Sequence, residues 1–419
     1  MVPLCLGGKI STGFRLPADD YMPPRHQDTN VICMKIKRRN FIKVAGAASA
    51  LLMTGGLNSN AMEKGLTFAS PIDGDMLNDK NDGKLVEGSL LTPIKIQAPA
   101  GSKIKVNGID AKYADGLFAA DVPLKNYENV IEAEETNTGQ KQSIAVFWLK
   151  NFTGKYRLSL DDNIWFLKDL SVNSGKYKSI FENPYLGFLK QVHDGYGTKI
   201  HINIFYQTEG FNLSQLTTQY KDEWKANAGW LRLSFHALQE KPDRPYLLAG
   251  YDEVKRDCEK VIQEIRRFAG TELTGSVTTL HWGEAKVEGS RALRDAGYTT
   301  QVGYFNVDND LSPVSYYLDV EQRRHLTHRA IWRDNREGIT FVRISQVINL
   351  FKLEQIVPML EEVKKDPRRS EFIELMIHEQ YFYPSYEAYQ PDFRQKVLTA
   401  VKWVVDNGYQ AAFLEECVA

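Results

Sequence analysis

The sequence lacks several features that mark common classes of protein. Lysine and arginine number 52 against 53 aspartates and glutamates, and this net charge of −1 gives no electrostatic reason to expect binding to nucleic acid. No glycine-rich loop follows the first strand of the expected α/β region, which argues against a nucleotide-dependent enzyme. Cysteines number only four, and Cys258 falls on the apolar face of an expected helix. We therefore expect Cys258 to be a buried free thiol, although a disulfide with Cys417 stays possible.

The first 61 residues are not expected to form a domain. Residues 1–33 look like an extension upstream of the natural start. Residues 34–61 resemble a twin-arginine export signal, because Arg38-Arg39 precedes the apolar run from Val44 to Met53. That run is too short to span a bilayer comfortably, and the alternative is a short buried helix with basic flanks. We expect a periplasmic or extracellular protein with no stable membrane anchor after the signal is removed.

Two segments are expected between this signal and residue 151. Residues 62–88 are rich in Asp, Asn and Gly, which predicts a linker. Residues 89–151 show short alternating strands and a hairpin signal at Asn107-Gly108. The runs 106–108, 116–118 and 129–131 resemble the small immunoglobulin-like sandwiches appended to secreted carbohydrate-active enzymes. We expect a small all-β immunoglobulin-like sandwich that serves as a spacer or orients a substrate.

From residue 155 to the end, strands alternate with helices, which predicts an α/β domain over 155–419. Strands are expected at 155–163, 199–206, 231–235, 277–280, 298–304, 339–344, 372–377 and 411–414. Helices are expected at 184–192, 252–268, 291–297, 353–364 and 392–407. Seven or eight such units favour a distorted (β/α)7-8 barrel over an open doubly wound sheet.

Ionisable residues follow the ends of several of these strands, where α/β barrels place their active sites. Three of the eight histidines in the chain lie at such ends. Two imidazoles and a carboxylate form a familiar site for a divalent metal, zinc above all. Water acidified by that metal becomes a nucleophile, and an adjacent carboxylate can take its proton. The strand-end residues are Asp161, Asp162, Glu209, His236, His281, His378 and Glu379.

The arrangement resembles the motifs of the NodB-homology polysaccharide deacetylases. Ser159-Leu160-Asp161-Asp162 is similar to that family's Thr-Phe-Asp-Asp, in which the first aspartate is the general base and the second binds metal. The run 236–240 is similar to its His-Ser/Thr-x-x-His, with Glu240 in place of the second histidine. Met376-Ile377-His378 is similar to its Leu-x-His, which supplies a general acid. The family's Arg-x-Pro-x-Gly motif is absent near 280–283, and its Asp-x-x-Asp-Trp motif is faint at 306–310.

The resemblance implies an exported metal-dependent hydrolase that removes N- or O-acyl groups from a glycan. Asp161 would be the base, His378 the acid, and Asp162 and His236 metal ligands, with Glu240 or His281 completing the site. Candidates for substrate binding near the strand ends are Trp165, Glu209, Trp230, Trp282, Glu379 and Tyr381.

Two other functions stay open at this point. One is a metal-independent glycosidase, which needs two carboxylates at a separation set by its mechanism. The other is a non-catalytic glycan-binding protein on the same fold. The carboxylates available to a glycosidase are Asp161, Asp162, Glu209, Glu240, Glu284 and Glu379.

Overall fold

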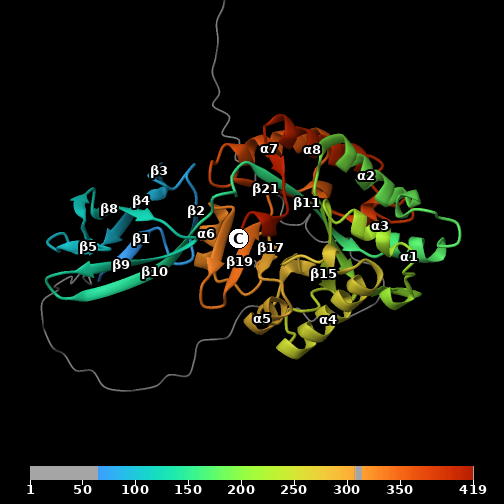
Figure 1. Ribbon diagram of the computed structural model, residues 1–419, viewed down its shortest axis with the longest axis horizontal. Coiled ribbons are helices and arrows are strands. Elements are labelled where there is room, and N and C mark those ends of the chain that lie inside the picture. Colours follow the sequence, from blue (N-terminus) through green and yellow to red (C-terminus); the bar gives the residue numbers. More distant parts are fainter. Residues whose placement is uncertain (1–64, 306, 308–313, 419) are drawn as a thin grey trace, which may run out of the picture. The chain divides into compact units, whose positions relative to one another are not determined.

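The computed structural model describes residues 65–305, 307 and 314–418. The expected upstream extension, the export signal and most of the 306–310 motif lie outside the described residues. The described residues group into one compact unit, which is shown in colour in Figure 1. None of the helices in the described ranges is both long and apolar enough to cross a membrane.

The first part of this unit consists of two five-stranded sheets that share a core. One sheet has the order β1 (Thr67–Ser70), β4 (Ser89–Gln97), β8 (Leu117–Leu124) and β7 (Lys112–Ala114), with β3 (Lys84–Val86) also paired to β4. The other has the order β2 (Met76–Leu77), β10 (Gln140–Trp148), β9 (Glu128–Glu135), β5 (Ile104–Val106) and β6 (Ile109–Asp110). Alternate residues such as Ile94, Val122 and Ile131 pack between the sheets. The expected β-sandwich is therefore present, and its immunoglobulin-like topology stays a prediction.

Residues 65–88 are not the linker that their composition predicts. They contribute β1, β2 and β3, and the side chains of Leu66 and Met76 are buried. The strands are two to four residues long. The Asp, Asn and Gly residues between them form turns, which have the same composition as a linker.

The second part is built on parallel strands. β11 (Lys155–Asn163) lies between β12 (Ile200–Phe205) and β21 (Phe372–His378). β15 (Leu231–Ala237) follows on the β12 side and β20 (Gln346–Val347) on the β21 side, while β22 (Gln410–Ala411) pairs with the start of β11. A second sheet contains β16 (Val277–Thr278), β17 (Thr300–Gly303), β19 (Ile339–Arg343) and the antiparallel β18 (Ile331–Asp334).

The predicted α/β alternation is confirmed, but the described strands do not form one closed barrel. A single bridge, from Leu233 on β15 to Thr274 just before β16, joins the two sheets at one junction, and no ladder joins β20 to the second sheet among the described residues. β16 is two residues long and soon gives way to the 3-10 turn η4 (His281–Gly283), so the ladder cannot continue there. The hydrogen-bonded ring is therefore interrupted at two places, and one of them lies beside His236 and His281.

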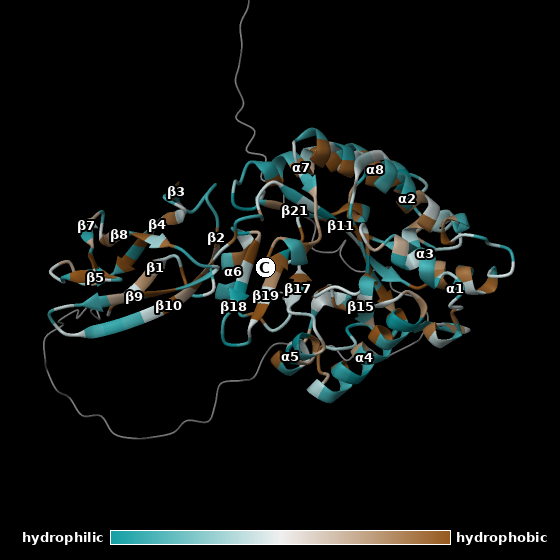
Figure 2. Cartoon of the chain, in the orientation of Figure 1, coloured by the Kyte–Doolittle hydropathy of each residue, from teal (hydrophilic) through white to brown (hydrophobic). Residues whose placement is uncertain are grey.

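Helices pack around these strands by burying one face each. α4 (Tyr251–Phe268) buries Val254, Cys258, Val261 and Ile265, and hydrophobic and hydrophilic residues alternate along it (Figure 2). Cys258 and Cys417 are both buried free thiols, as expected for Cys258. The other helices are α1 (Trp165–Val172), α2 (Pro184–Tyr196), α3 (Lys221–Ala226), α5 (Val287–Asp295), α6 (Val320–Thr327), α7 (Ile356–Lys364) and α8 (Phe393–Asp406).

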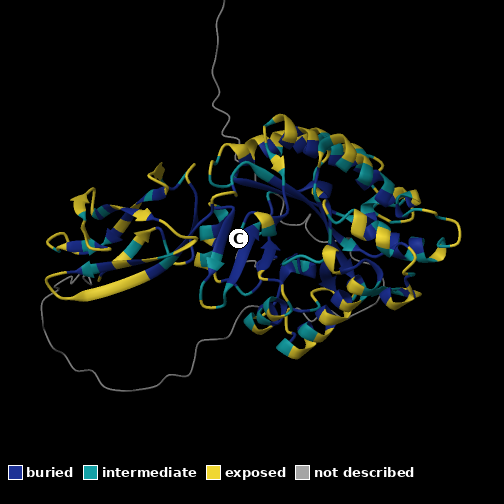
Figure 3. Cartoon of the chain, viewed as in Figure 1, coloured by how far each residue is buried: buried dark blue, intermediate teal, exposed yellow. Residues whose placement is uncertain are grey.

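The parallel strands are mostly buried (Figure 3), and several of the buried side chains on them are polar or charged. Arg157 makes a bidentate ion pair with Glu374 on the neighbouring strand, at 2.7 to 3.1 Å. Its Nη1 donates to His201 Nδ1 at 2.9 Å, so His201 Nε2 carries the hydrogen and donates to Ser234 Oγ at 2.6 Å. Side chains alternate along a strand, so the residues two and four positions after Arg157, His201, Ser234 and Glu374 face the same interior as these four do. Those residues include Asp161, Asn203, His236 and His378.

Candidate metal and catalytic site

Three side chains at the carboxyl ends of the strands converge on one point. The Oδ1 atom of Asp162 lies 2.8 Å from His236 Nε2 and 2.9 Å from His281 Nδ1. The two imidazole nitrogens are themselves 3.2 Å apart. Asp162 comes from the end of β11, His236 from β15 and His281 from η4. Two imidazoles and a carboxylate in this arrangement can hold a metal ion.

The hydrogen bonds behind the two imidazoles determine which nitrogens carry a proton. His236 Nδ1 donates to the carbonyl of Thr279 at 2.5 Å, and His281 Nε2 donates to the carbonyl of Glu240 at 3.2 Å. A carbonyl can only accept, so the hydrogens of the neutral rings are directed away from the convergence point. The other two nitrogens then present lone pairs to each other and to the Asp162 carboxylate.

This grouping of three acceptors requires positive charge at its centre. One proton could join Asp162 to one of the two imidazoles, but the other lone pair would still face a carboxylate oxygen. A divalent cation can bind the Asp162 oxygen and both imidazole nitrogens at once. The remaining oxygen of Asp162 accepts from Gln380 Nε2 at 2.7 Å, so every candidate ligand is oriented by a second hydrogen-bonded partner. The residues present therefore fit a divalent metal.

A β-bulge brings Asp161 and Asp162 to the same site. The pairing of β11 with β12 shifts register between Leu160 and Asn163, and Asp162 has a positive φ of 60°. Asp161 faces the strand interior, is 2% exposed, and accepts from Asn203 Nδ2 at 2.7 Å. Adjacent aspartates can thus have different partners, Asn203 for one and the histidines for the other.

Burial and charge act differently on these acidic and basic groups. Burial raises the pKa of Asp161, and this outweighs the charges of His236 and His378 and the Asn203 hydrogen bond. Burial also opposes ionisation of Asp162, but the histidines around it hold its pKa well below the usual range. Burial alone would lower the pKa of His236, yet Asp161 and Asp162 raise it. Asp161 therefore holds a proton more readily than its neighbour does.

His378 lies beside this cluster at the end of β21, opposite Asp161 in the strand register. Its Nδ1 donates to Asn349 Oδ1 at 2.9 Å, which leaves Nε2 without a partner among the described residues. Tyr381 packs near the imidazole, with ring centroids 6.1 Å apart. An imidazole half-buried in this way can exchange a proton with a molecule in the site.

The structure places several predicted carboxylates away from this cluster. Glu240 has an exposed side chain, and only its backbone carbonyl reaches His281. Glu209 is exposed on the turn between β13 (Gln207–Thr208) and β14 (Phe211–Asn212). Glu379 is fully buried and accepts from the backbone N–H groups of Ile164, Trp165 and Phe166 at 2.6 to 3.0 Å. It caps α1 and is closed off from substrate.

Some of the predicted aromatic residues lie near the metal site, and others lie away from it. Trp230 precedes β15, at the end of the strand opposite His236, and stacks on His193 with centroids 4.4 Å apart. Since it is 7% exposed and bonded to Asn227, it packs the far end of the strands and does not line the site. Trp282, by contrast, directly follows His281 and is half-buried with a positive φ of 64°. Trp165 is half-buried at the start of α1, 5.3 Å from the ring of Tyr383.

Four residues that support the site were missed from sequence. These are Asn203, Gln380, Asn349 and Phe205, whose ring lies 5.2 and 5.0 Å from the imidazoles of His236 and His281. Asn203 could have been found, because it is a polar residue inside the apolar strand Ile200–Phe205. Gln380 and Asn349 lie in 3-10 turns, where no periodicity indicates which way a side chain points.

Comparisons with known proteins give only distant similarities. No family model matches the chain, and no curated protein matches it. Among solved structures, a candidate polysaccharide deacetylase from Mycobacterium smegmatis is 11% identical, with a TM-score of 0.35, over 64% of this chain and 90% of that one. Another, from Bordetella bronchiseptica and described as involved in O-antigen biosynthesis, is 9% identical, with a TM-score of 0.29, over 62% and 86%.

A third similar structure is Aspergillus clavatus Sph3 in complex with GalNAc. It is 13% identical, with a TM-score of 0.32, over 59% of this chain and 98% of that one. These similarities do not assign the chain to a family.

Proposed function

We propose that this protein is a metal-dependent hydrolase that removes acyl groups from a glycan. The observation that supports the metal is the convergence of Asp162, His236 and His281, whose nearest side-chain atoms lie 2.8 to 3.2 Å from one another. The similarity of Ser159–Asp162 and of His378 to the deacetylase motifs supports the reaction and the glycan. We also propose that the protein acts outside the cytoplasm, on the basis of the arginine pair at 38–39.

In this proposal Asp162, His236 and His281 would hold one divalent cation, with zinc the best match to their donor atoms. Such an ion, when bound, polarises a carbonyl oxygen and acidifies water. Asp161 takes a proton from the attacking water as the water oxygen bonds to the acyl carbon. His378 gives a proton to the nitrogen or oxygen of the sugar as its bond to that carbon breaks. Asn203 holds the Asp161 carboxylate in place by donating to Oδ1.

The alternative function, a metal-independent glycosidase, has fewer carboxylates available in the structure than the sequence suggests. Glu379 is closed off at the start of α1, and buried Glu284 is paired with Arg244, with 3.3 Å between Arg244 Nε and Glu284 Oε2. Asp162 is surrounded by two histidines, which a paired-carboxylate mechanism does not need. The described site therefore favours the hydrolase that uses a metal.

The first test is metal content measured by elemental mass spectrometry on the purified protein. We expect about one equivalent of zinc or another divalent metal, because three ligands with fixed partners form one site. Asp162→Ala and His236→Ala should each lose the metal and the release of acetate from acetylated glycans. Asp161→Asn should keep the metal and lose turnover, since Asp161 is not one of the three ligands.

His193→Gln is the matched control, because this histidine packs against Trp230 at the other end of the strands and should leave metal content unchanged. Wild-type protein that binds no divalent metal, even after incubation with zinc, would rule out the proposed mechanism. Full acetate release by Asp161→Asn would instead remove Asp161 as the base and leave the metal site standing.

A further inference from the structure

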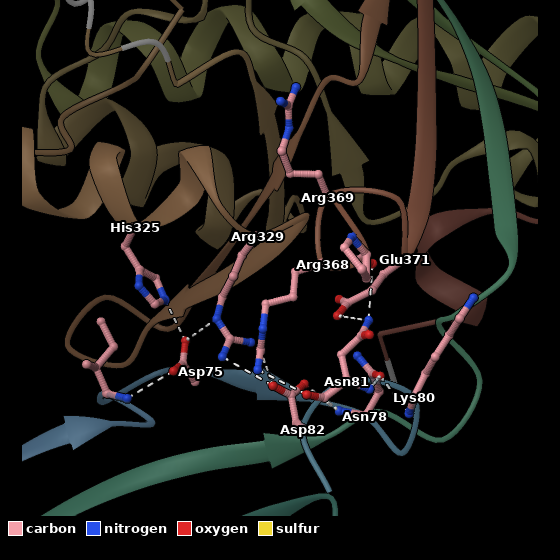
Figure 4. Close-up of polar contacts among 12 residues, drawn as sticks. Asp75, Asn78, Lys80, Asn81, Asp82, His325, Arg329, Arg368, Arg369 and Glu371 are labelled. Atoms are coloured by element: carbon pink, nitrogen blue, oxygen red, sulfur yellow. Dashed lines mark hydrogen bonds and ion pairs between the residues drawn. The ribbon is translucent and has the colours of Figure 1, made fainter. Parts of the chain in front are cut away.

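The structure contains a polar cavity that shares no residue with the metal site. It has a volume of about 480 Å³, within the range of sites for small ligands. Its wall comes from the segment around β2, β3 and β4, from Asp121 on β8, and from Arg329 and Arg368 of the α/β part. Figure 4 shows the two arginines reaching toward Asp82. We call this space the basic cavity.

The charges on its wall are mainly positive. Five cationic side chains line it, against two anionic ones, Asp82 and Asp121. Asp82 is already paired with both Arg329 and Arg368. The remaining cations are exposed lysines that form no ion pair within the described part of the chain, and they are Lys80, Lys84 and Lys95. The basic cavity therefore carries positive charge that the protein itself does not neutralise.

Two buried polar atoms in this wall have no hydrogen-bond partner among the described residues. They are Arg329 Nη1 and Thr92 Oγ1, in side chains that are 6% and 2% exposed. Asp75 and Asp82 fix the guanidinium of Arg329 through its other nitrogens, each at 3.3 Å. A buried donor without an acceptor is costly. Each of these atoms exposes less than 1 Å², so a small side-chain movement is needed before a ligand oxygen in the cavity supplies the acceptor.

The side chains of the wall also limit the chemical class of ligand that the basic cavity can bind. None of the described residues lining the basic cavity is aromatic, so a neutral sugar would lack a stacking surface there. The cations offer partners to an anionic group. Asp121, Asn81 and Thr92 offer acceptors and donors to neighbouring hydroxyl groups, which an inorganic ion would not use.

We propose that the basic cavity binds an acidic saccharide, with the carboxylate of a uronic acid held by Arg329 and the lysines. The preference for an anion rests on the cavity alone, and the choice of a saccharide rests on the proposed function. The site would hold an acidic part of the glycan on the β-sandwich, separate from the residues that carry out the reaction.

Isothermal titration calorimetry on the full chain tests this with trigalacturonate, neutral galactotriose and sodium sulfate. We expect trigalacturonate to bind at least about tenfold more tightly than the neutral trisaccharide. The Lys84→Ala/Lys95→Ala double variant should lose at least about tenfold in affinity, because both lysines line the basic cavity and their positive charge would be lost. Lys125→Ala, an exposed lysine of the same β-sandwich that does not line the cavity, is the control and should bind normally.

Each contrary outcome overturns a stated part of the proposal. Equal affinity for the acidic and neutral trisaccharides, or no loss in the double variant, rules out the anion site. Sulfate binding at least as tightly as trigalacturonate shows a site for inorganic anions and rules out the saccharide. Repeating the titration with Asp162→Ala separates the two proposals, because the basic cavity should keep its affinity there even if the metal site is lost.

Discussion

At the scale of single residues, the contact that most affects the proposed reaction is the one from Asn203 to Asp161. The buried Asp161 carboxylate accepts from Asn203 Nδ2 at 2.7 Å, and in the proposed reaction this bond would hold the carboxylate that takes the proton. Asn203→Ala should lower kcat for acetate release by about tenfold to a hundredfold, the effect of losing one hydrogen bond to a buried charged group. Metal content should stay at the wild-type value. Loss of metal together with activity would show that Asn203 supports the whole fold of the site.

How far the sequence predicts such contacts differs from residue to residue. Asp161, Asp162, His236 and His378 follow apolar strands, and the chain order alone brings them to one edge of the sheet. The sequence cannot show that the carbonyl of Thr279 fixes the His236 tautomer, because a backbone group has no residue signature. These missed contacts are the ones that orient the predicted residues.

At the scale of elements, the pairing of β11 with β21 contains a buried ion pair. Arg157 and Glu374 are both fully buried. They lie opposite each other in the strand register and form an ion pair. Glu374→Gln should reduce the free energy of unfolding by about 3–5 kcal/mol, measured by urea denaturation, because it leaves a buried arginine without its counterion. Arg157→Met combined with Glu374→Leu should recover much of that loss, since neither charge remains. A loss below about 1 kcal/mol in Glu374→Gln would show that the pair is weakly coupled.

The elements themselves are largely predictable from pattern. The expected strand at 155–163 and the helix at 252–268 agree with β11 and α4 within one residue. The prediction of a closed barrel was wrong, because closure depends on pairing between the two sheets at both of their junctions and not on any local period of the sequence. The prediction of a linker was wrong over residues 65–88, because strands of two to four residues joined by turns are too short to show alternation in the sequence.

At the scale of the whole molecule, Glu371 joins the segment before β21 to the turn after β2. Its carboxyl is 1% exposed and accepts from Asn81 Nδ2 at 2.9 Å, and burial followed by the charge of Asp82 raises its pKa from 4.5 to about 7. The folded protein then binds this proton more tightly than the unfolded chain does, so the stabilisation is complete below pH 4.5 and is lost as the pH rises through 7. Gln in place of Glu371 keeps a side-chain oxygen that can accept from Asn81 but cannot ionise. The difference in the free energy of unfolding, wild type minus Glu371→Gln, should therefore fall by about 2–3 kcal/mol between pH 5 and pH 8. Glu132→Gln, on the exposed face of β9, is the control and should show no such change. Parallel pH profiles for wild type and Glu371→Gln would show that Glu371 is already ionised in the folded protein.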